Sequence, residues 1–333
     1  MKLALIGFGY WSKNYFNTIK EMDDISLDYI CDSNDANLKN IRKKYPNINC
    51  LNDFNEILEK KIDGAIIVTP SSTHFDIAKK FLENGINVLV EKPMTIMSDD
   101  AKRLYEKADE SGKILMVGHI FKYNPALNIA KKIVDSGEMG EIRYIESRRV
   151  GLGPIRNDVS ALWDLATHDI YISNYLVGKM PTKISCIGIS HNSKIEDIVS
   201  VNMKFGDQVL STVYANWEHP VKERKIYIGG SKKAILFDDI ELSNKISIFD
   251  KGVTYQPSSG DFAEFIASLR DGDISIPQVP NTPPLKTEIE HFLKCIKGEE
   301  KCFTNGKEGY EVVKILEIAE ESKKNGGIEL DIK

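Results

Sequence analysis

Five short apolar runs near the start of the chain constrain its fold more than any other feature. They are continuous rather than alternating, so each predicts a strand buried on both faces. The runs are KLALIG (2–7), SLDYICD (26–32), GAIIVTP (64–70), NVLVEKP (87–93) and KILMVGH (113–119). Segments with helical periodicity separate them, among them 74–84 and 98–111. This alternation of strands and helices predicts an α/β fold with a doubly wound parallel sheet from residue 1 to about 120.

The second of these helices has a start signal. Ser98 is the expected N-cap, and Asp99 and Asp100 follow it in the first turn. A serine hydroxyl can accept a hydrogen bond from a free backbone N–H at a helix start, and acidic residues favour the same end.

The pattern changes after about residue 140. The stretch IVSVNMKFGDQVLSTVYANW (198–217) alternates between apolar and polar residues, which indicates strands with one buried face. Turn signals at 229–233 and 249–252 continue the series, so we expect an open, mostly antiparallel sheet. A proline-rich loop (275–284) and two helices, at about 286–297 and 308–324, complete the chain.

This change of pattern predicts two domains. The first spans residues 1–122 and carries the parallel sheet, and the second spans residues 123–333 and carries the open sheet. We expect the last helices to pack back near the first domain.

Composition excludes several classes of protein. The chain is 42% hydrophobic and 28% charged, the balance of a globular protein. A net charge of -5 argues against nucleic acid or an anionic membrane as the main partner. The opening MKLALIGFGYWSKN is too short an apolar run for a signal peptide, and no run reaches the roughly 20 apolar residues of a membrane helix. We therefore expect a cytoplasmic protein.

The cysteines predict neither a disulfide framework nor a zinc site. They are odd in number and form no Cys-x-x-Cys pair, so we expect them to be reduced and structural. They are Cys31, Cys50, Cys186, Cys295 and Cys302.

The first predicted strand ends in GFGYWS, a fragment of the dinucleotide-binding fingerprint. Gly7 would allow the tight turn, Gly9 the close approach of backbone to a pyrophosphate, and Ser12 stands where a third glycine is usual. Asp32 lies about 20 residues beyond Ser12, at the end of the second strand. A glycine turn in another kind of α/β sheet is the alternative.

The stretch ALWDLATHDIYI (161–172) carries Asp164 and His168 four residues apart in a predicted helix. At that spacing both side chains project from one face, where they could serve acid/base chemistry or form an ordinary surface pair. Asp169 adds a second carboxylate, but without a third ligand at a known spacing we expect no metal here.

Five motifs in order along the chain resemble one family. GFGYW, VTPSSTH (68–74), EKP (91–93), GHIFKYNPA (118–126) and DLATHD (164–169) together are similar to the glucose-fructose oxidoreductase, inositol dehydrogenase and MocA oxidoreductases. The resemblance extends to the HFLKCIKGEEKCFTNGKEGYEVVKILEIAEES segment near the C-terminus. It implies an NAD(P)-dependent enzyme that oxidises a CH–OH group.

The resemblance also implies the catalytic residues. Lys92 would lie beside the nicotinamide and the substrate hydroxyl, and Pro93 would follow a cis peptide bond. His168 would take the hydroxyl proton while Lys92 steadies the oxygen, although these two roles could be exchanged. Asp164 would orient its neighbours.

Cofactor contacts are expected at the ends of the first strands. The expected residues are Gly7, Phe8, Gly9, Tyr10, Trp11, Asp32, Thr69, Pro70, His74, Glu91 and Lys92. NAD is favoured over NADP, because the Asp32 carboxylate would repel a 2′-phosphate and the following SNDANLKN offers no arginine. His74 and His119 either contact the cofactor or are structural, whereas His191, His219 and His291 are expected to be structural.

The segment RRVGLGPIRNDVSALWDLATHD (148–169) is expected to border the substrate. Arg148, Arg149 and Arg156 offer planar donors for phosphate or carboxylate, and Asn157 with Asp158 could bind sugar hydroxyls. The alternative is that these arginines form structural salt bridges. The expected substrate-binding residues are Lys92, Tyr123, Asn124, Arg149, Arg156, Asn157, Asp164 and His168.

This segment resembles the family branch that acts on nucleotide-activated sugars. The implied reaction is oxidation of the ring 3-hydroxyl of a UDP-N-acetylhexosamine to a ketone, for surface polysaccharide or amino-sugar synthesis. The alternatives are an inositol or free-sugar dehydrogenase and a non-catalytic NAD-binding redox sensor. The presence of Lys92, Asp164 and His168 together argues against the sensor. The resemblance further implies a homodimer or homotetramer that pairs through the open sheet.

Overall fold

The computed structural model describes residues 1–153, 155–191, 195–257 and 265–332, and in it the chain divides into two compact units. The first unit consists of Met1–Tyr123 and Thr282–Glu317. The second consists of Asn124–Asn281 and Ile318–Lys333. The first boundary lies one residue beyond the predicted position, whereas Thr282–Glu317 belongs to the first unit and not to the second domain.

The first unit is built on a six-stranded sheet in which every strand runs parallel to its neighbours. The strand order is β3-β2-β1-β4-β5-β6, so the chain starts in the middle of the sheet and builds each side in turn. The strands are β1 (Lys2–Ile6), β2 (Ser26–Cys31), β3 (Asn49–Leu51), β4 (Gly64–Ile67), β5 (Asn87–Glu91) and β6 (Leu115–Gly118). The predicted doubly wound sheet is confirmed, with the short edge strand β3 as an addition.

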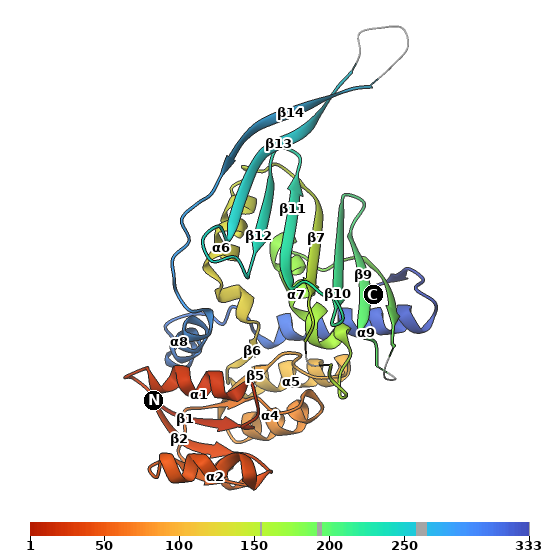
Figure 1. Cartoon of the computed structure of the whole chain (residues 1–333). Helices are drawn as coiled ribbons and strands as arrows, with labels where there is room; N and C mark the ends of the chain where they lie inside the picture. The colour runs from red at the N-terminus through yellow and green to blue at the C-terminus, as the bar shows by residue number, and fades with distance from the viewer. Residues whose placement is uncertain (154, 192–194, 258–264, 333) are drawn as a thin grey trace. The chain divides into compact units, whose positions relative to one another are not determined.

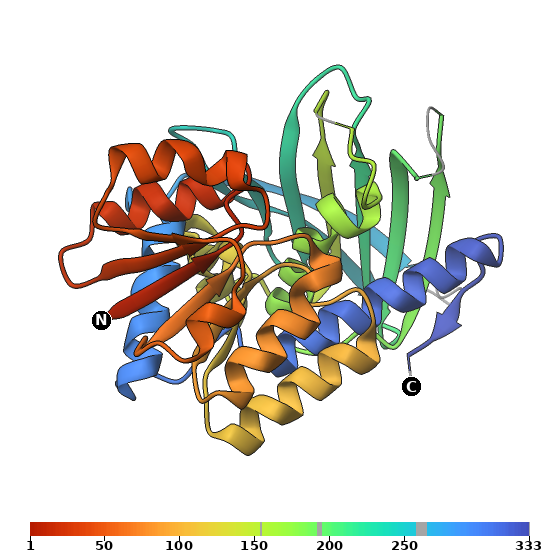
Figure 2. The ribbon, with the colours of Figure 1, turned by 90° about the horizontal axis from the view of Figure 1, so that it is seen from below.

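Helices cover both faces of this sheet (Figure 2). On one face, Phe16 of α1, Leu38 of α2 and Phe292 of α8 join Leu3 and Leu5 of β1 in one apolar cluster. Helices α4 and α5 cover the other face. The helical elements are α1 (Ser12–Lys20), α2 (Asp35–Lys44), α3 (Asn55–Leu58), η1 (Ser71–Thr73), α4 (His74–Glu83), α5 (Ser98–Ser111), η2 (Ile120–Tyr123), α8 (Pro284–Lys297) and the first part of α9 (Gly306–Lys324), whose residues from Ile318 on belong to the second unit. The packing of α8 explains why Thr282–Glu317 belongs to this unit.

The start of α5 differs from the prediction. Helix α5 begins at Ser98, but Met97 occupies the N-cap position and makes no side-chain capping bond. The Ser98 hydroxyl instead donates a hydrogen bond to the carboxylate of Glu317 in α9. The prediction of Ser98 as an N-cap is therefore wrong, because Ser98 is the first helical residue and the residue before it occupies the cap position. Asp99 and Asp100 lie in the first turn as predicted.

The second unit is built on a nine-stranded sheet of order β14-β13-β12-β11-β7-β10-β9-β8-β15 (Figure 1). Strands β7 and β10 run parallel, and the other neighbours run antiparallel. The strands are β7 (Ile142–Val150), β8 (Lys183–Ile189), β9 (Ile198–Phe205), β10 (Val209–Asn216), β11 (Glu223–Gly230), β12 (Ala234–Asp238), β13 (Ile246–Pro257), β14 (Phe265–Ser275) and β15 (Leu330–Asp331). The predicted mostly antiparallel sheet is confirmed.

Two helices, α6 (Pro125–Asp135) and α7 (Thr167–Val177), cover one face of this sheet (Figure 1). Because the helices cover one face, burial alternates along strand β7. Ile145, Ser147 and Arg149 are buried toward the helices, whereas Tyr144 and Glu146 on the other face are exposed. In the described part of the chain, helices therefore cover only one face of this sheet.

Among the described residues, the helices are too short or too polar for any of them to cross a membrane.

Candidate active site

The carboxyl ends of the parallel strands bring the expected cofactor residues to one edge of the first unit. Gly7 follows β1, Asp32 follows β2, Thr69 comes shortly after β4, Glu91 ends β5 and His119 follows β6. Strand order reverses between β1 and β4, and ligands of open α/β sheets bind in the crevice at such a point. Residues far apart in sequence thus share one edge.

The turn after β1 requires glycine. Gly7 has φ +89°, and a Cβ there would lie 2.7 Å from the carbonyl oxygen of Val68, just after β4. At Gly9 an added Cβ would meet nothing within 4 Å, so the backbone borders open space. A ligand phosphate could therefore approach the backbone at Gly9 and the N-terminus of α1. Ser12 is buried, and among the described residues its hydroxyl has no hydrogen-bond partner.

Asp32 fixes the same turn from the end of β2. Its Oδ2 accepts a hydrogen bond from the Phe8 N–H at 2.6 Å, and its Oδ1 accepts one from the Asn34 N–H at 2.8 Å. Each carboxylate oxygen keeps a further lone pair for a hydroxyl donor. The turn and this carboxylate could together hold the pyrophosphate and adenine ribose of a dinucleotide, and the predicted contacts of Gly7, Gly9 and Asp32 with it stay predictions.

Lys92 stands on a loop that a buried carboxylate anchors. Glu91 is 8% exposed; it accepts hydrogen bonds from Trp11 Nε1 at 2.6 Å, from the Tyr15 hydroxyl at 2.9 Å and from the Lys92 N–H at 3.0 Å. Trp11 follows the glycine turn, so this carboxylate ties the loop after β5 to the turn after β1. The Lys92–Pro93 peptide bond is cis, as the family resemblance implied.

A second buried carboxylate, Glu288 of α8, completes this network. The Tyr15 hydroxyl lies 2.9 Å from Glu91 Oε1 and 3.0 Å from Glu288 Oε2. One hydroxyl hydrogen cannot serve two carboxylates, so one of the acids must itself donate a proton. Burial, then the nearby Glu91 charge, raises the pKa of Glu288 well above its ordinary value. Burial raises the pKa of Glu91 as well, but less than that of Glu288. We therefore assign the proton to Glu288, which would donate to Tyr15 while Tyr15 donates to Glu91.

Two histidines near this edge are neutral. His74 Nδ1 lies 2.9 Å from the Pro93 carbonyl oxygen and Nε2 lies 2.8 Å from that of Thr69, so the ring links the loops after β5 and β4. Burial lowers its pKa. Burial, together with the Lys92 and Lys122 charges, lowers the pKa of His119 to about 3. Neither ring therefore carries a charge near neutral pH.

Two further residues predicted to contact the cofactor, Tyr10 and Pro70, lie at the surface of the first unit. Tyr10 is 89% exposed, and Pro70 is also exposed at the start of η1. Their predicted cofactor contacts stay predictions.

In the second unit, Asp164 and His168 occupy two kinds of helix. Asp164 lies in η3 (Leu162–Ala166), a π-helical turn, and His168 lies in the α-helix α7. The helix predicted over 161–172 is present, and its first turn is π-helical rather than α-helical. Single π-helical turns are rare and often occur at functional sites. Asp164 accepts a hydrogen bond from Arg156 at 3.2 Å.

Arg149 has a structural role in this unit. Its Nε and Nη2 donate to the two carboxylate oxygens of Asp169 at 2.6 and 3.1 Å, and both side chains are almost fully buried. The pair ties β7 to α7, one residue after His168. The burial of the guanidinium against a carboxylate fits the structural alternative, and substrate binding by Arg149 stays a prediction.

Arg156 and its neighbours form an exposed polar group on the segment before η3. Arg156 pairs with both oxygens of Asp158, at 2.9 and 2.6 Å, in addition to Asp164. Asn157 is exposed between them. Arg148 pairs with Glu223 of β11 at 3.1 Å. Arg156 therefore fixes the Asp164 carboxylate, and Asn157 is open to a ligand.

Tyr123 and Asn124 serve the fold rather than an open surface. The Tyr123 hydroxyl is buried 3.1 Å from Thr304 Oγ1. Asn124 is the N-cap of α6: its side chain accepts from the Ala126 N–H at 3.0 Å, and Pro125 follows at the first helical position. Asn-Pro at a helix start is typical of an N-cap, so the sequence carried the signal for this role of Asn124. Substrate binding by Tyr123 and Asn124 stays a prediction.

The residues that the sequence analysis missed are Tyr15 and Glu288. They lie 273 residues apart in the chain, so no local spacing connects them. A glutamate in the apolar stripe of a predicted helix was the available signal, because a buried carboxylate needs a partner.

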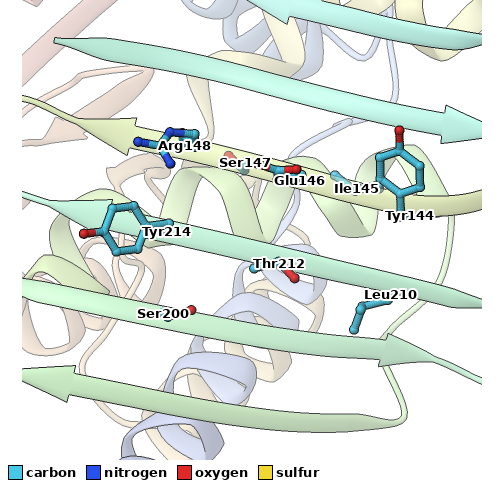
Figure 3. Close-up of a pocket in the computed structure, with 9 residues that line it drawn as sticks. All are labelled: Tyr144, Ile145, Glu146, Ser147, Arg148, Ser200, Leu210, Thr212 and Tyr214. Carbon is cyan, nitrogen blue, oxygen red and sulfur yellow. The ribbon is translucent and has the colours of Figure 1, made fainter. Parts of the chain in front are cut away.

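The face of the second sheet opposite α6 and α7 carries a hollow (Figure 3). It is lined by Tyr144, Ile145, Glu146, Ser147, Arg148, Ser200, Leu210, Thr212 and Tyr214. These residues lie on β7, β9 and β10, so the hollow belongs to the sheet and not to the segment before η3.

Comparison with known proteins adds independent evidence. A model of an oxidoreductase family with an NAD-binding Rossmann fold (GFO_IDH_MocA) matches residues 1–119, and the model of the family's C-terminal domain matches residues 128–236. UDP-N-acetylglucosamine 3-dehydrogenase of Acidithiobacillus ferrooxidans is 26% identical over 261 residues, which span 78% of each chain. The NAD(+)-dependent scyllo-inositol 2-dehydrogenase of Bacillus subtilis is 28% identical over 262 residues, 73% of this chain and 70% of its own.

A solved structure agrees on the fold. The WlbA dehydrogenase from Bordetella pertussis, in complex with NADH and UDP-GlcNAcA, has a TM-score of 0.81 to this chain. The match covers 100% of this chain and 99% of that one at 20% identity. At this identity the likeness shows a shared fold.

Proposed function

The chain belongs to the glucose-fructose oxidoreductase, inositol dehydrogenase and MocA family of NAD-binding oxidoreductases, and from this premise we propose that it oxidises a nucleotide-activated sugar. The proposed substrate is a UDP-N-acetylhexosamine, and the 3-hydroxyl of its ring becomes a ketone. Such a ketone is what a later transamination would consume in surface polysaccharide or amino-sugar synthesis.

The position of Lys92 carries the proposal. It follows the end of β5, and Glu91 connects its loop to Trp11 beside the glycine turn. A cation held there is next to the backbone that a dinucleotide needs. This proximity supports Lys92 as the group that meets the reacting oxygen.

NAD, when bound, accepts the hydride that leaves the sugar carbon. We assign His168 as the base that takes the hydroxyl proton, and Lys92 as the cation that stabilises negative charge on that oxygen. Asp164, held by Arg156, would orient the base or the sugar. The exchange of the His168 and Lys92 roles is the alternative.

The choice of a nucleotide sugar rests on a relative. The UDP-N-acetylglucosamine 3-dehydrogenase aligns over 78% of both chains. On this chain, the exposed Arg156, Asn157 and Asp158 supply polar groups on the segment that leads to η3. To bind the ligand, Arg156 would have to release one of its two carboxylate partners, Asp158 or Asp164, and donate to a phosphate or hydroxyl of the ligand instead.

The test is incubation with NAD and a panel of substrates. UDP-N-acetylglucosamine should give NADH and a 3-keto sugar, with an aminotransferase added to remove the product. Free glucose and inositol form the comparison arm. Much more efficient oxidation of a free sugar or inositol would reject the nucleotide-sugar assignment and leave the dehydrogenase activity in place.

An inositol dehydrogenase is the second candidate. The scyllo-inositol 2-dehydrogenase is 28% identical to this chain, slightly more than the nucleotide-sugar relative. The same panel separates the two candidates. We also propose a reducing compartment such as the cytoplasm, since the five cysteines carry free thiols.

A further inference from the structure

One histidine and two cysteines of the first unit form a cluster that the proposed reaction does not use. His291 and Cys295 lie four residues apart on α8 and so face the same side, and Cys302 lies between α8 and α9. His291 Nε2 and the two Sγ atoms lie within 4.8 Å of one another. The Cys295 Sγ is 3.3 Å from His291 Nε2.

We propose that His291, Cys295 and Cys302 bind one thiophilic metal ion of the Zn²⁺ type. Zinc binds thiolate sulfur at about 2.3 Å and imidazole nitrogen at about 2.0 Å in tetrahedral sites, so sulfur and nitrogen ligands lie about 3.5 Å apart. The Cys295–His291 separation of 3.3 Å is close to that value. Three protein ligands leave one position of the ion for water.

A carboxylate orients the imidazole toward the sulfurs. His291 Nδ1 lies 2.8 Å from Glu300 Oε2, and Lys294 holds the other oxygen of Glu300 at 2.7 Å. With its Nδ1–H donated to the carboxylate, the ring keeps the lone pair of Nε2 for the cluster. Metal-binding histidines usually have such a carboxylate partner, which fixes the tautomer and raises ligand basicity.

The surroundings suit a neutral metal complex. His291 and Cys295 are each 4% exposed, and the His291 ring stacks on Phe303 with 4.3 Å between centroids. Two thiolates balance the charge of a divalent ion, so the complex adds no net charge to a buried site. Sulfur and imidazole ligands favour zinc, cadmium or copper(I) over magnesium or calcium.

Binding would compete with one existing hydrogen bond. The Phe303 N–H donates to His291 Nε2 at 3.1 Å, on the lone pair that the metal would take. Because Phe303 follows Cys302, a small shift of this segment could release the N–H and bring the second sulfur closer. The next residue, Thr304, accepts the Val117 N–H of β6 at 2.7 Å, so the ion would stabilise the connection between α8, α9 and the sheet.

The test is a titration of the reduced, chelator-treated protein with Cd²⁺. One equivalent should produce the ultraviolet charge-transfer absorption of cadmium–thiolate bonds, and Zn²⁺ should displace it. Cys302→Ser should lose most of this absorption, and Glu300→Gln should weaken binding by roughly 10- to 100-fold. Zn²⁺ should also raise the thermal midpoint of the wild type but not of Cys302→Ser.

Cys50→Ser is the matched control, because Cys50 is a partly buried thiol of the same unit outside the cluster. It should bind Cd²⁺ like the wild type, and circular dichroism should show that each variant is folded. The proposal is overturned if the wild type gives no charge-transfer absorption with one equivalent of Cd²⁺. It is equally overturned if Cys302→Ser binds the ion undiminished.

Discussion

Lys92 and His168 are the residues whose removal tests the proposed chemistry most directly. Without the cation or the base, charge on the reacting oxygen is stabilised less well and its proton has no acceptor. Lys92→Ala and His168→Ala should each lower turnover by roughly 10² or more. NADH affinity, measured by fluorescence titration, should remain nearly unchanged.

The controls for these variants are a lysine and a histidine without a proposed role. Lys102 pairs with Glu106 on the surface of α5, and His219 lies half-buried in the second unit, where its Nδ1 contacts the backbone of Val221. Lys102→Ala and His219→Ala should keep wild-type turnover. Near-normal turnover in both Lys92→Ala and His168→Ala would refute the assignment.

Asp32 should decide the choice of cofactor. Its carboxylate lies beside the glycine turn and would accept the ribose hydroxyls of NAD, whereas it would repel a 2′-phosphate. Titration with both reduced cofactors should give tighter binding of NADH than of NADPH. Tighter binding of NADPH would contradict the prediction.

Glu288 should make the stability of the wild type depend on pH. Its pKa is raised above the ordinary value of 4.5 in the folded protein, so above pH 4.5 the folded chain holds a proton that the unfolded chain has lost. The stabilisation is fully present below pH 4.5 and is lost as the pH rises toward the folded pKa. Glu288→Gln cannot lose this proton, and its amide can still donate to Tyr15.

Urea unfolding at several pH values checks this prediction. As the pH rises above the ordinary pKa, the free energy of unfolding of the wild type should fall relative to Glu288→Gln. The slope of the difference should approach about 1.4 kcal/mol per pH unit for one proton. Glu290 is a half-exposed glutamate of the same helix, and Glu290→Gln should follow the wild type. Parallel curves for the wild type and Glu288→Gln would show that Glu288 is ionised when folded.

At the scale of the helices, Asn124 and Asn157 should behave in opposite ways. Asn124 caps α6 and also donates to Asp239 at 3.3 Å, whereas Asn157 is exposed before η3. Asn124→Ala should lower the free energy of unfolding by about 1 kcal/mol with little change in the KM for the sugar. Asn157→Ala should raise that KM without changing stability. Urea unfolding and steady-state kinetics measure both, and the reverse pattern would restore Asn124 as a substrate ligand.

Strands were easier to predict from the sequence than helix ends and polar pairs. A strand buried on both faces needs continuous apolar residues. The five apolar runs near the start of the chain therefore predicted five of the six strands of the parallel sheet. Ser98 is the first residue of α5 and not its cap, and its hydroxyl bonds to Glu317, which is distant in sequence. The buried pair of Arg149 and Asp169 depends likewise on the packing of α7 against β7.

Part of the candidate site could be predicted from the sequence, because some of its residues directly follow strands that the sequence predicts. Gly7 and Asp32 follow strand ends, so the parallel sheet brings them to one edge whatever the rest of the chain does. The π-helical turn at Asp164 and the proton on Glu288 depend instead on contacts between elements that no spacing reveals.

At the scale of the whole molecule, the face of the second sheet opposite α6 and α7 is the surface that we expect to contact a second copy of the chain. Tyr144, Ile187 and Leu210 are 46%, 65% and 45% exposed on β7, β8 and β10, among strands whose other face is buried. The hollow of Figure 3 lies on the same face. Apolar side chains gathered on one flat surface often mark a contact between copies of a chain.

We therefore expect a dimer or tetramer that pairs through this face. Leu210→Glu places a charge among the exposed apolar residues, so burying that face would cost the desolvation of a carboxylate and the oligomer should dissociate. Leu242→Glu is the matched control, because Leu242 is 88% exposed in the turn between β12 and β13, away from the strands of that face. Light scattering at micromolar concentration should show an oligomer for the wild type and Leu242→Glu, and smaller particles for Leu210→Glu. A wild type that runs only as a 37.5 kDa monomer would rule out pairing under these conditions. An oligomer that persists in Leu210→Glu would place the interface elsewhere.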